Sequence, residues 1–421
     1  MSRFIFTFKK FVLQYKKLVI ASLVIGFMAA LLGVSLKHIT EHYEGLLFSR
    51  AQSNPLWLIV FPFIGLSLIY ILRYYLFKKK ENKGIKEVFE STASGKPLPA
   101  YKIPSHFVNG LLTVIFGGST GIEVSTVVAT AAIGSLATQK EPFLKKYKTE
   151  LICAGIAAGI TALFNTPFAG LLFAYEVISK KTTKPLAISS IISAAVAYAF
   201  IFMLDEEPLF AVHITQWHTY ALPWFMVLGV LAGINAVYLT KSVLYFKKKF
   251  AVFSNNYYKI VLGAAAISIM IMLLPQLYGE GYHAIKMYIT GANTLVLTPM
   301  VALTLAGIIF LKPIITSITL SAGGDGGVFA PGIFIGAFLG LFLAIVLNTF
   351  FDAGVIPLNF MIVGMAAMLS ASIHAPFTAL FLICGLINNY TLFIPLLIVC
   401  LVAKYTAQRI YPYTVYTYAN K

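Results

Sequence analysis

The chain has 421 residues, of which 59% are hydrophobic and only 11% are charged. A soluble domain carries about 25% charged residues, so this composition excludes an ordinary cytosolic enzyme, a disordered chain and a secreted disulfide scaffold. The 32 Lys and Arg residues outnumber the 15 Asp and Glu residues, for a formal charge of +17. In a polytopic membrane protein this excess predicts basic cytoplasmic loops, and we expect no nucleic-acid partner.

The N-terminal segment, residues 1–17, is aromatic and basic, which predicts an interfacial helix before the first span. The apolar run at 18–36 has the length of a span and lacks a clear small-residue cleavage site, so we expect no cleaved signal peptide. The protein is predicted to lie in the cell (inner) membrane. A cytoplasmic N-terminus is predicted by four lysines before this run, Lys9, Lys10, Lys16 and Lys17.

Long apolar runs recur along the chain, and each full-length run can cross a bilayer as a helix of about 20 residues. They lie at residues 18–36, 56–77, 187–204, 220–240, 259–274, 296–311, 328–350, 355–373 and 391–403. Shorter apolar pieces broken by Gly and Pro lie at 103–117, 124–138, 150–164, 168–179 and 376–387. Broken helices at membrane depth are tolerated where they line a cavity, which is typical of transporters. We therefore expect an all-α polytopic membrane domain with a first half at 18–204 and a second half at 205–421.

All three cysteines lie inside apolar runs, at Cys153, Cys384 and Cys400. Their spacing matches neither a metal site nor a disulfide framework, so they are predicted to be small buried hydrophobic residues. The sequence predicts no cofactor and no metal.

An internal repeat relates the two halves. The segment GGSTGIEVS, which begins at Gly117, resembles GGDGGVFAP, which begins at Gly323. Glycines match at a constant offset of 206 residues, and a later pair of Pro-Phe segments, FNTPFAGLLF and IHAPFTALFL, matches at an offset of 209. Two matched motifs in the same order favour two related halves over chance similarity among small residues. Such halves in transporters are often inverted, with the binding site at their interface.

Each Gly-rich break is followed at once by an apolar segment, which places free backbone N–H groups at a helix start. The predicted helix starts are Ile122-Glu123-Val124 and Val328-Phe329-Ala330. Helix N-termini favour anions, and two of them aimed at one cavity would bind an anion without a full positive charge. Weak binding of this kind suits a transport pathway.

Three acidic residues lie outside the loops and basic clusters, Glu123, Glu176 and Asp325. A carboxylate at membrane depth is a functional hypothesis by default. An ionised Glu123 would occupy the anion's place and protonation would release it, although a carboxylate that only caps its helix is the alternative. Glu176 is at least as consistent with a structural acid at a helix end as with transport. Asp325 is consistent with a turn as well as with a site.

These segments resemble the CLC family of chloride channels and chloride/proton antiporters. GIEVS at 121–125 is similar to that family's glutamate-bearing motif, and GGVFAP at 326–331 is similar to its Gly-x-Phe-x-Pro motif. The two Pro-Phe segments resemble its Asn-x-Pro segment and the counterpart in its second half, and RIYPY resembles the segment with the inner tyrosine. The resemblance is collinear from about residue 80 to residue 413.

The resemblance implies a homodimer of inverted repeats with tilted and broken helices and one pore in each subunit. It assigns Glu123 as the gating glutamate and the backbone N–H groups of Val328 and Phe329, at the helix start that ends with Ala330, as central anion ligands. The backbone around Ile122, Glu123 and Val124 corresponds to the outer site. The inner tyrosine corresponds to Tyr411, with Tyr413 as the alternative.

The sequence departs from the family pattern at three points. The family's Gly-Ser-Gly-Ile-Pro motif falls on Asn82-Lys83-Gly84-Ile85-Lys86, so Lys83 replaces the anion-coordinating serine, with Gly84 and Ile85 beside it. Lys83 either lines the anion path or points to water in a solvated basic run. The antiporters' internal proton-transfer glutamate falls on Val177, which puts efficient proton coupling in doubt. Ile122 and Val124-Ser125 replace a basic residue and a Gly-Pro turn around Glu123.

The favoured hypothesis is transport of chloride or a similar anion through a glutamate-gated pathway, either passive or coupled to protons. Fluoride, nitrate and bicarbonate are alternative anions, although GGVFAP is closer to the chloride-type pattern than to that of the fluoride exporters. A cation/proton transporter would need clustered carboxylates, and the sequence offers isolated ones. A membrane enzyme would need a His/Asp/Glu cluster, and the seven histidines are dispersed, with His374 alone in a helix-break motif.

Overall fold

The computed structural model describes residues 2–79 and 82–418, and these residues form helices joined by loops, with one isolated β-bridge and no other strand. The helices of the first half are α1 (Ser2–Ser53), α2 (Leu56–Ile71), η1 (Leu72–Leu76), α3 (Lys86–Ser94), α4 (Lys102–Ile115), α5 (Glu123–Lys140), η2 (Pro142–Tyr147), α6 (Lys148–Phe164), α7 (Pro167–Phe173), η3 (Ala174–Ser179) and α8 (Lys184–Met203).

The helices of the second half are η4 (Thr219–Ala221), α9 (Leu222–Ala251), α10 (Asn256–Leu273), η5 (Pro275–Leu277), α11 (Tyr282–Gly291), η6 (Ala292–Thr294), α12 (Pro299–Ala322), α13 (Phe329–Phe351), α14 (Pro357–Ile373), α15 (Pro376–Leu386) and α16 (Phe393–Ile410). The all-α polytopic fold expected from the apolar runs is confirmed.

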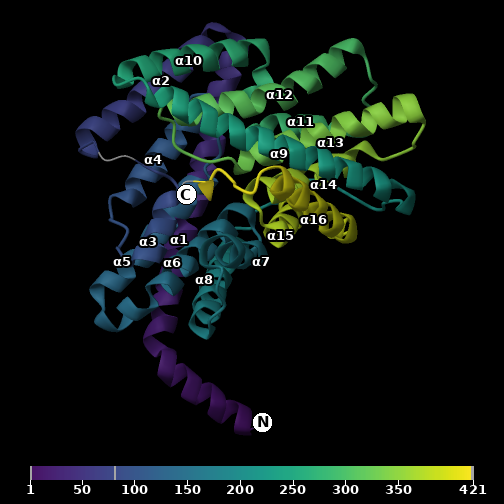
Figure 1. The fold of residues 1–421 in the computed structure, drawn as a ribbon. Coiled ribbons are helices and arrows are strands. Elements are labelled where there is room, and N and C mark those ends of the chain that lie inside the picture. The colour runs from purple at the N-terminus through teal and green to yellow at the C-terminus, as the bar shows by residue number, and fades with distance from the viewer. Residues whose placement is uncertain (1, 80–81, 419–421) are drawn as a thin grey trace.

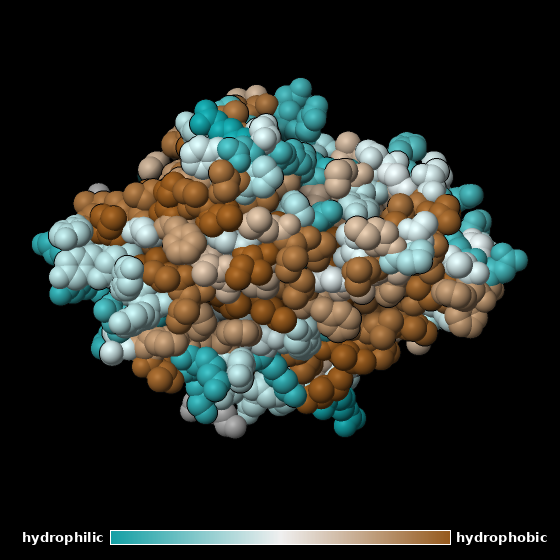
Figure 2. All heavy atoms as spheres, turned by 90° about the horizontal axis from the view of Figure 1, so that it is seen from above, coloured by the Kyte–Doolittle hydropathy of each residue, from teal (hydrophilic) through white to brown (hydrophobic). Residues whose placement is uncertain are grey.

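Nine helical segments of the described chain are long and apolar enough to cross a membrane. Eight of the nine long runs predicted from the sequence correspond to them. The run at 355–373 is instead the shorter helix α14, whereas the short piece predicted at 150–164 belongs to Pro142–Phe164, which has the length of a span. Figure 2 shows hydrophobic residues in a broad band across one face, with hydrophilic residues mainly toward its edges.

The N-terminal segment is continuous with the first span. The predicted boundary at residue 17 is not a break in the chain, because α1 runs as a single helix from Ser2 to Ser53. Figure 1 shows its N-terminal part extending away from the rest of the bundle. A helix of this length exceeds the roughly 20 residues that a bilayer accommodates, so part of α1 lies outside the hydrocarbon core.

The two repeats meet at the Gly-rich breaks found in the sequence. Gly121 and Gly327, which are equivalent residues of the two repeats, form an antiparallel β-bridge with N···O distances of 3.4 and 3.2 Å. Beside the bridge, the N–H of Ser119 donates to the hydroxyl of Thr319 (3.1 Å) and the N–H of Asp325 donates to the hydroxyl of Thr113 (2.9 Å). Ser119 is equivalent to Asp325 and Thr113 is equivalent to Thr319, so each repeat forms the same hydrogen bond to the other. The repeats therefore pack about a local two-fold axis and run in opposite directions.

The helix breaks also recur in both repeats. Helices α6 and α14 end at Asn165 and His374, two non-glycine residues in the left-handed region, with φ of 53° and 57°. Both are followed two residues later by a proline that opens the next helix, α7 or α15. A left-handed residue ends a helix and a proline starts one without loss of a backbone hydrogen bond, so this pairing explains the repeated Pro-Phe motif.

Candidate functional site

The breaks between α4 and α5 and between α12 and α13 bring two helix N-termini together in the protein interior. Helix α5 begins at Glu123 and α13 begins at Phe329, and the β-bridge holds the two preceding loops against each other. In α13 the first backbone bond within the helix is donated by Gly332 to Val328, so the N–H groups of Phe329 and Ala330 have no partner within it. Phe329 and Ala330 are fully buried, and these N–H groups, which the helix leaves free, favour a negatively charged group.

Glu123 occupies the position where the two helix starts meet. Its side chain is 1% exposed, and Oε1 accepts a hydrogen bond from the hydroxyl of Tyr282 at 2.7 Å. The other oxygen, Oε2, faces the backbone N–H groups of Glu123 and Ala330 but forms no hydrogen bond of normal geometry with the described residues. An ionised carboxylate at this point lies where two helix N-termini attract negative charge.

A cavity of about 190 Å³ lies on the other side of the bridge, and we call it the Lys83 cavity. Five of the residues predicted from the sequence to bind the anion lie along its wall. These are Lys83, Gly84, Ile85, Val124 and Val328, and the other residues along its wall include Lys247, Asp325 and Tyr416. Lys83 is exposed at this cavity and at a second surface cavity lined by Glu87 and Lys102, so it stands at the mouth of the site.

The tyrosine beside Val328 is Tyr416, and the prediction of Tyr411 or Tyr413 for this place is wrong. The N–H of Val328 donates to the Tyr416 hydroxyl at 3.3 Å, and Tyr416 is buried. Tyr411 directly follows α16, and its ring packs against Tyr413 and under the Lys241 ammonium instead. The chain leaves the helix after Ile410 and turns back toward the interior, so the buried tyrosine comes later than the motif suggested.

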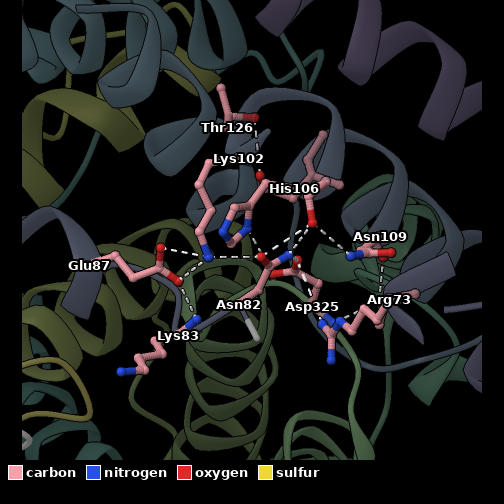
Figure 3. Close-up of polar contacts among 12 residues, drawn as sticks. Arg73, Asn82, Lys83, Glu87, Lys102, His106, Asn109, Thr126 and Asp325 are labelled. Carbon is pink, nitrogen blue, oxygen red and sulfur yellow. Dashed lines mark hydrogen bonds and ion pairs between the residues drawn. The ribbon is translucent and has the colours of Figure 1, made fainter. Parts of the chain in front are cut away.

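A buried polar network fixes the loop before α13 (Figure 3). Asp325 accepts hydrogen bonds from Asn82 at 2.6 Å and pairs with His106 at 3.1 Å, and Arg73 lies 3.8 Å away. Asn82 in turn accepts from Lys102. Opposite charges and hydrogen bonds compensate the buried Asp325 carboxylate, so it anchors the Gly-rich loop rather than only forming a turn.

The same network continues to Glu87, which pairs with Lys102 at 2.7 Å (Figure 3). The side chain of Lys83 points away from the network, while its backbone N–H faces Glu87. This arrangement ties the predicted anion-binding segment at 82–86 to α3 and α4.

Glu176 lies at a helix end and accepts hydrogen bonds there, which fits the structural one of the two roles predicted for it. Its Oε2 accepts from the backbone N–H of Thr378 at 2.7 Å and from the hydroxyl of the same residue at 2.6 Å. The carboxylate therefore caps the N-terminus of α15. Val177, at the position of the family's internal glutamate, is a buried aliphatic residue.

Sequence reasoning missed three buried residues on the side of Glu123 away from the Lys83 cavity. Tyr282 holds the Glu123 carboxylate, and Glu280 accepts the N–H of Ile122 at 2.9 Å. Lys312 is fully buried in α12 and donates to backbone oxygens of the loop before Glu280. Two sequence features could have identified these residues: the acid between two glycines in GEGY at 279–282, and the lysine at 312 inside an apolar run.

Together the fold and the site define a membrane anion transporter in which broken helices from two inverted repeats form the pathway. The chain belongs to the voltage gated chloride channel family, which it matches over residues 64–408. It is 26% identical over 378 residues to a putative chloride channel protein ClcB-like of Ralstonia nicotianae, covering 86% of this chain and 85% of the relative. It is 28% identical over 418 residues to the H(+)/Cl(−) exchange transporter ClcA of Cronobacter sakazakii, covering 93% and 86%.

Solved structures share the fold over almost the whole chain. A CLC-type fluoride/proton antiporter superposes with a TM-score of 0.79 at 25% identity, covering 96% of this chain and 98% of that one. A slow cyanobacterial Cl−/H+ antiporter superposes with a TM-score of 0.83 at 22% identity, covering 96% and 97%. These similarities confirm the assignment to the CLC fold.

Proposed function

We propose that this protein exchanges chloride for protons across the membrane, with Glu123 as both gate and proton acceptor. The observation that carries the proposal is the buried Glu123 carboxylate at the meeting point of two helix N-termini, next to the Lys83 cavity. The relative from Cronobacter sakazakii is named an H(+)/Cl(−) exchange transporter, which supports the same coupling.

The ionised carboxylate of Glu123 competes with chloride for the positive ends of α5 and α13. Protonation removes the negative charge, so the attraction to the helix ends is lost and the side chain leaves the pathway. Chloride then moves from the Lys83 cavity, where the Val328 N–H and the Tyr416 hydroxyl are polar ligands, toward the vacated position. Binding by partial charges alone is weak enough to allow release.

The charge distribution supports a cytoplasmic N-terminus and a cytoplasmic Lys83 cavity. The helix directions support a position for Lys83, Lys86 and the basic clusters at 140–148, 180–184 and 241–249 on the side of this cavity. The opposite side carries acids in the loop at 204–218 and at Glu280. Basic residues concentrate on the cytoplasmic side of membrane proteins, so Glu123 would face the outside and Lys83 the inside, in the cell (inner) membrane.

We further propose that the transporter is a homodimer with one pathway in each subunit. Large apolar side chains are exposed along the start of α7, α15 and α16, at Phe168, Phe377 and Ile394. The rings of Phe168 and Phe381 stack at a centroid distance of 5.7 Å, which joins this face across the two repeats. A second copy, or lipid, would cover such a face.

The test is a flux assay on purified protein in liposomes. An imposed chloride gradient should drive protons uphill, and Glu123→Gln should abolish proton movement and make anion flux insensitive to pH. Glu207→Gln, which neutralises an exposed acid on the same side, is the matched control and should behave like the wild type.

Each contrary result would refute a different part of the proposed function. Chloride flux without proton movement in the wild type would show a passive channel. A rate for fluoride far above that for chloride would favour the fluoride alternative, and a strong response to sodium or potassium gradients with no anion flux would refute anion transport.

A further inference from the structure

Glu280 lies in the loop between η5 and α11, directly beside the start of α5. The flanking residues Gly279 and Gly281 have φ of 55° and 89°, a conformation that suits glycine and turns the Glu280 side chain inward. Glu280 is 3% exposed, and its Oε1 accepts the backbone N–H of Ile122 at 2.9 Å. The Glu280 carboxylate, which comes from the second half of the chain, therefore accepts a hydrogen bond from a backbone N–H group at the outer end of the anion pathway.

A second carboxylate and a buried ammonium complete the cluster around this loop. Glu44 of α1 accepts the backbone N–H of Glu280 at 3.1 Å. Lys312 of α12 is fully buried, donates to the carbonyl oxygens of Leu277 and Gly279, and lies 4.3 Å from the centre of the Phe334 ring. Other ionisable groups that face the cluster are Lys37 and Glu41 of α1, Tyr278 of the loop, and Tyr282, His283 and Lys286 of α11.

Two cavities connect this cluster to Glu123 and to the protein surface. The larger, of about 190 Å³, is lined by Glu41, Glu44, Glu280 and Tyr282, and exposed residues on its wall show that it opens to solvent. The smaller, of about 20 Å³, is lined by Glu123, Glu280 and Tyr282. Its volume is enough for one water molecule, and Glu280 borders both cavities.

The charges of the cluster do not balance if every acid is ionised. Glu44, Glu280 and Glu123 would carry three negative charges around the fully buried ammonium of Lys312, because Lys37 is paired with Glu206 and Lys286 is exposed. Burial and repulsion between like charges both disfavour this state, so a proton taken up by one of the three carboxylates relieves it. Oε2 of Glu123, which is buried and lacks a normal hydrogen bond, is an acceptor for that proton.

We propose that Glu280 transfers protons between the larger cavity and Glu123, which makes it a second protonatable residue of the transport cycle. The inference rests on the proton-coupled exchange proposed above. The Glu280 carboxylate takes a proton from water in the larger cavity and passes it, through one water molecule in the smaller cavity, to the Glu123 carboxylate. Glu280 returns to its ionised form and again accepts the N–H of Ile122.

The variant that tests this inference is Glu280→Gln, which keeps an oxygen acceptor for the Ile122 N–H but cannot carry a proton. Proton flux should fall by about tenfold or more, because a positioned acid or base accelerates proton transfer by at least that factor. Chloride flux should remain, so the number of chloride ions moved for each proton should rise. Glu207→Gln, on the same side of the membrane and exposed, should leave this ratio unchanged.

A second measurement separates proton transfer from a merely structural role. With the protein oriented in a planar bilayer, Glu280→Gln should weaken the response of flux to pH on the Glu280 side and leave the response to pH on the Lys83 side intact. A variant that retains the wild-type exchange ratio and both pH responses would overturn the role of Glu280, while exchange itself would still stand.

Failure of the exchange proposal has a different signature, because the wild type itself would then move no protons. Glu280→Asp provides the check on folding and chemistry, since it keeps an ionisable group one methylene shorter. It should recover part of the proton flux that Glu280→Gln loses. Equal loss in both variants, with normal chloride flux, would assign Glu280 to holding the loop rather than to carrying protons.

Discussion

Removal of the Tyr282 hydroxyl isolates the interaction that holds the gate. Tyr282→Phe deletes the donor at 2.7 Å from Glu123 Oε1 and keeps the ring that packs edge-to-face on Phe210. A hydrogen bond to a charged group contributes about 1.5–3 kcal/mol. Loss of that amount shifts the balance between the blocked and open positions of Glu123 by roughly 10-fold to 150-fold.

The variant should therefore open under less acidic conditions than the wild type. The hydroxyl stabilises the ionised carboxylate in its blocking position, so without it protonation and release compete more successfully, and the midpoint of pH activation moves to higher pH. Anion flux from liposomes, measured over a pH series, gives both the rate and the midpoint.

Tyr288→Phe is the matched control, because Tyr288 lies on the same helix and its hydroxyl has no hydrogen bond among the described residues. An unchanged rate and pH midpoint in Tyr282→Phe would refute the idea that this hydroxyl holds the gate. The same shift in both variants would show that loss of a hydroxyl anywhere on α11, and not loss of this particular hydrogen bond, is responsible.

Three further predictions concern the cavity and the stability of the fold. Tyr416→Phe should weaken chloride binding, measured calorimetrically, by about 1 kcal/mol, whereas Tyr411→Phe should not. Lys83→Ser should slow flux at low ionic strength, with the difference shrinking as salt is added, if this exposed ammonium concentrates anions at the cavity mouth. Burial alone would raise the pKa of Glu206, but the hydrogen bonds and charges of Lys37 and His38 together outweigh it and lower the pKa below 4.5. This stabilisation is present above about pH 4.5 and lost in more acid solution, so Glu206→Gln should lower the melting temperature in detergent at neutral pH and remove that acid sensitivity.

The arrangement of helices was largely predictable because the membrane imposes it. Long apolar runs have few alternatives to spanning helices, and the matched glycines located the breaks and the meeting of the two repeats. Close packing explains why glycines recur at matched positions. A side chain at Gly134 would meet the backbone of Leu151, and one at the equivalent Gly340 would meet that of Phe360. Glu123 was predictable because it stands alone in an apolar segment directly after such a break.

The parts of the site that depend on loop conformation were not predictable. Four tyrosines lie within the last eight described residues, and which of them returns to Val328 depends on a turn that no local pattern specifies. Glu280 lies in a segment with the composition of a surface loop, and its burial follows from two left-handed glycines and from Lys312, which is distant in sequence. Lys83 remains a prediction, since its exposed position at the cavity mouth fits both an anion-attracting and a solvated side chain.

The antiparallel bridge between Gly121 and Gly327 has a consequence for how this sequence can vary over time. Each residue faces its own counterpart from the other repeat, and each is closely surrounded, Gly121 by the side chains of Glu123 and Ala330 and Gly327 by that of Val124. A side chain added at Gly121 would displace Glu123 or Ala330, and one added at Gly327 would displace Val124, so each repeat limits the size of the residue that the other can place at the bridge. We expect both positions to remain glycine for as long as Glu123 keeps its place at the start of α5.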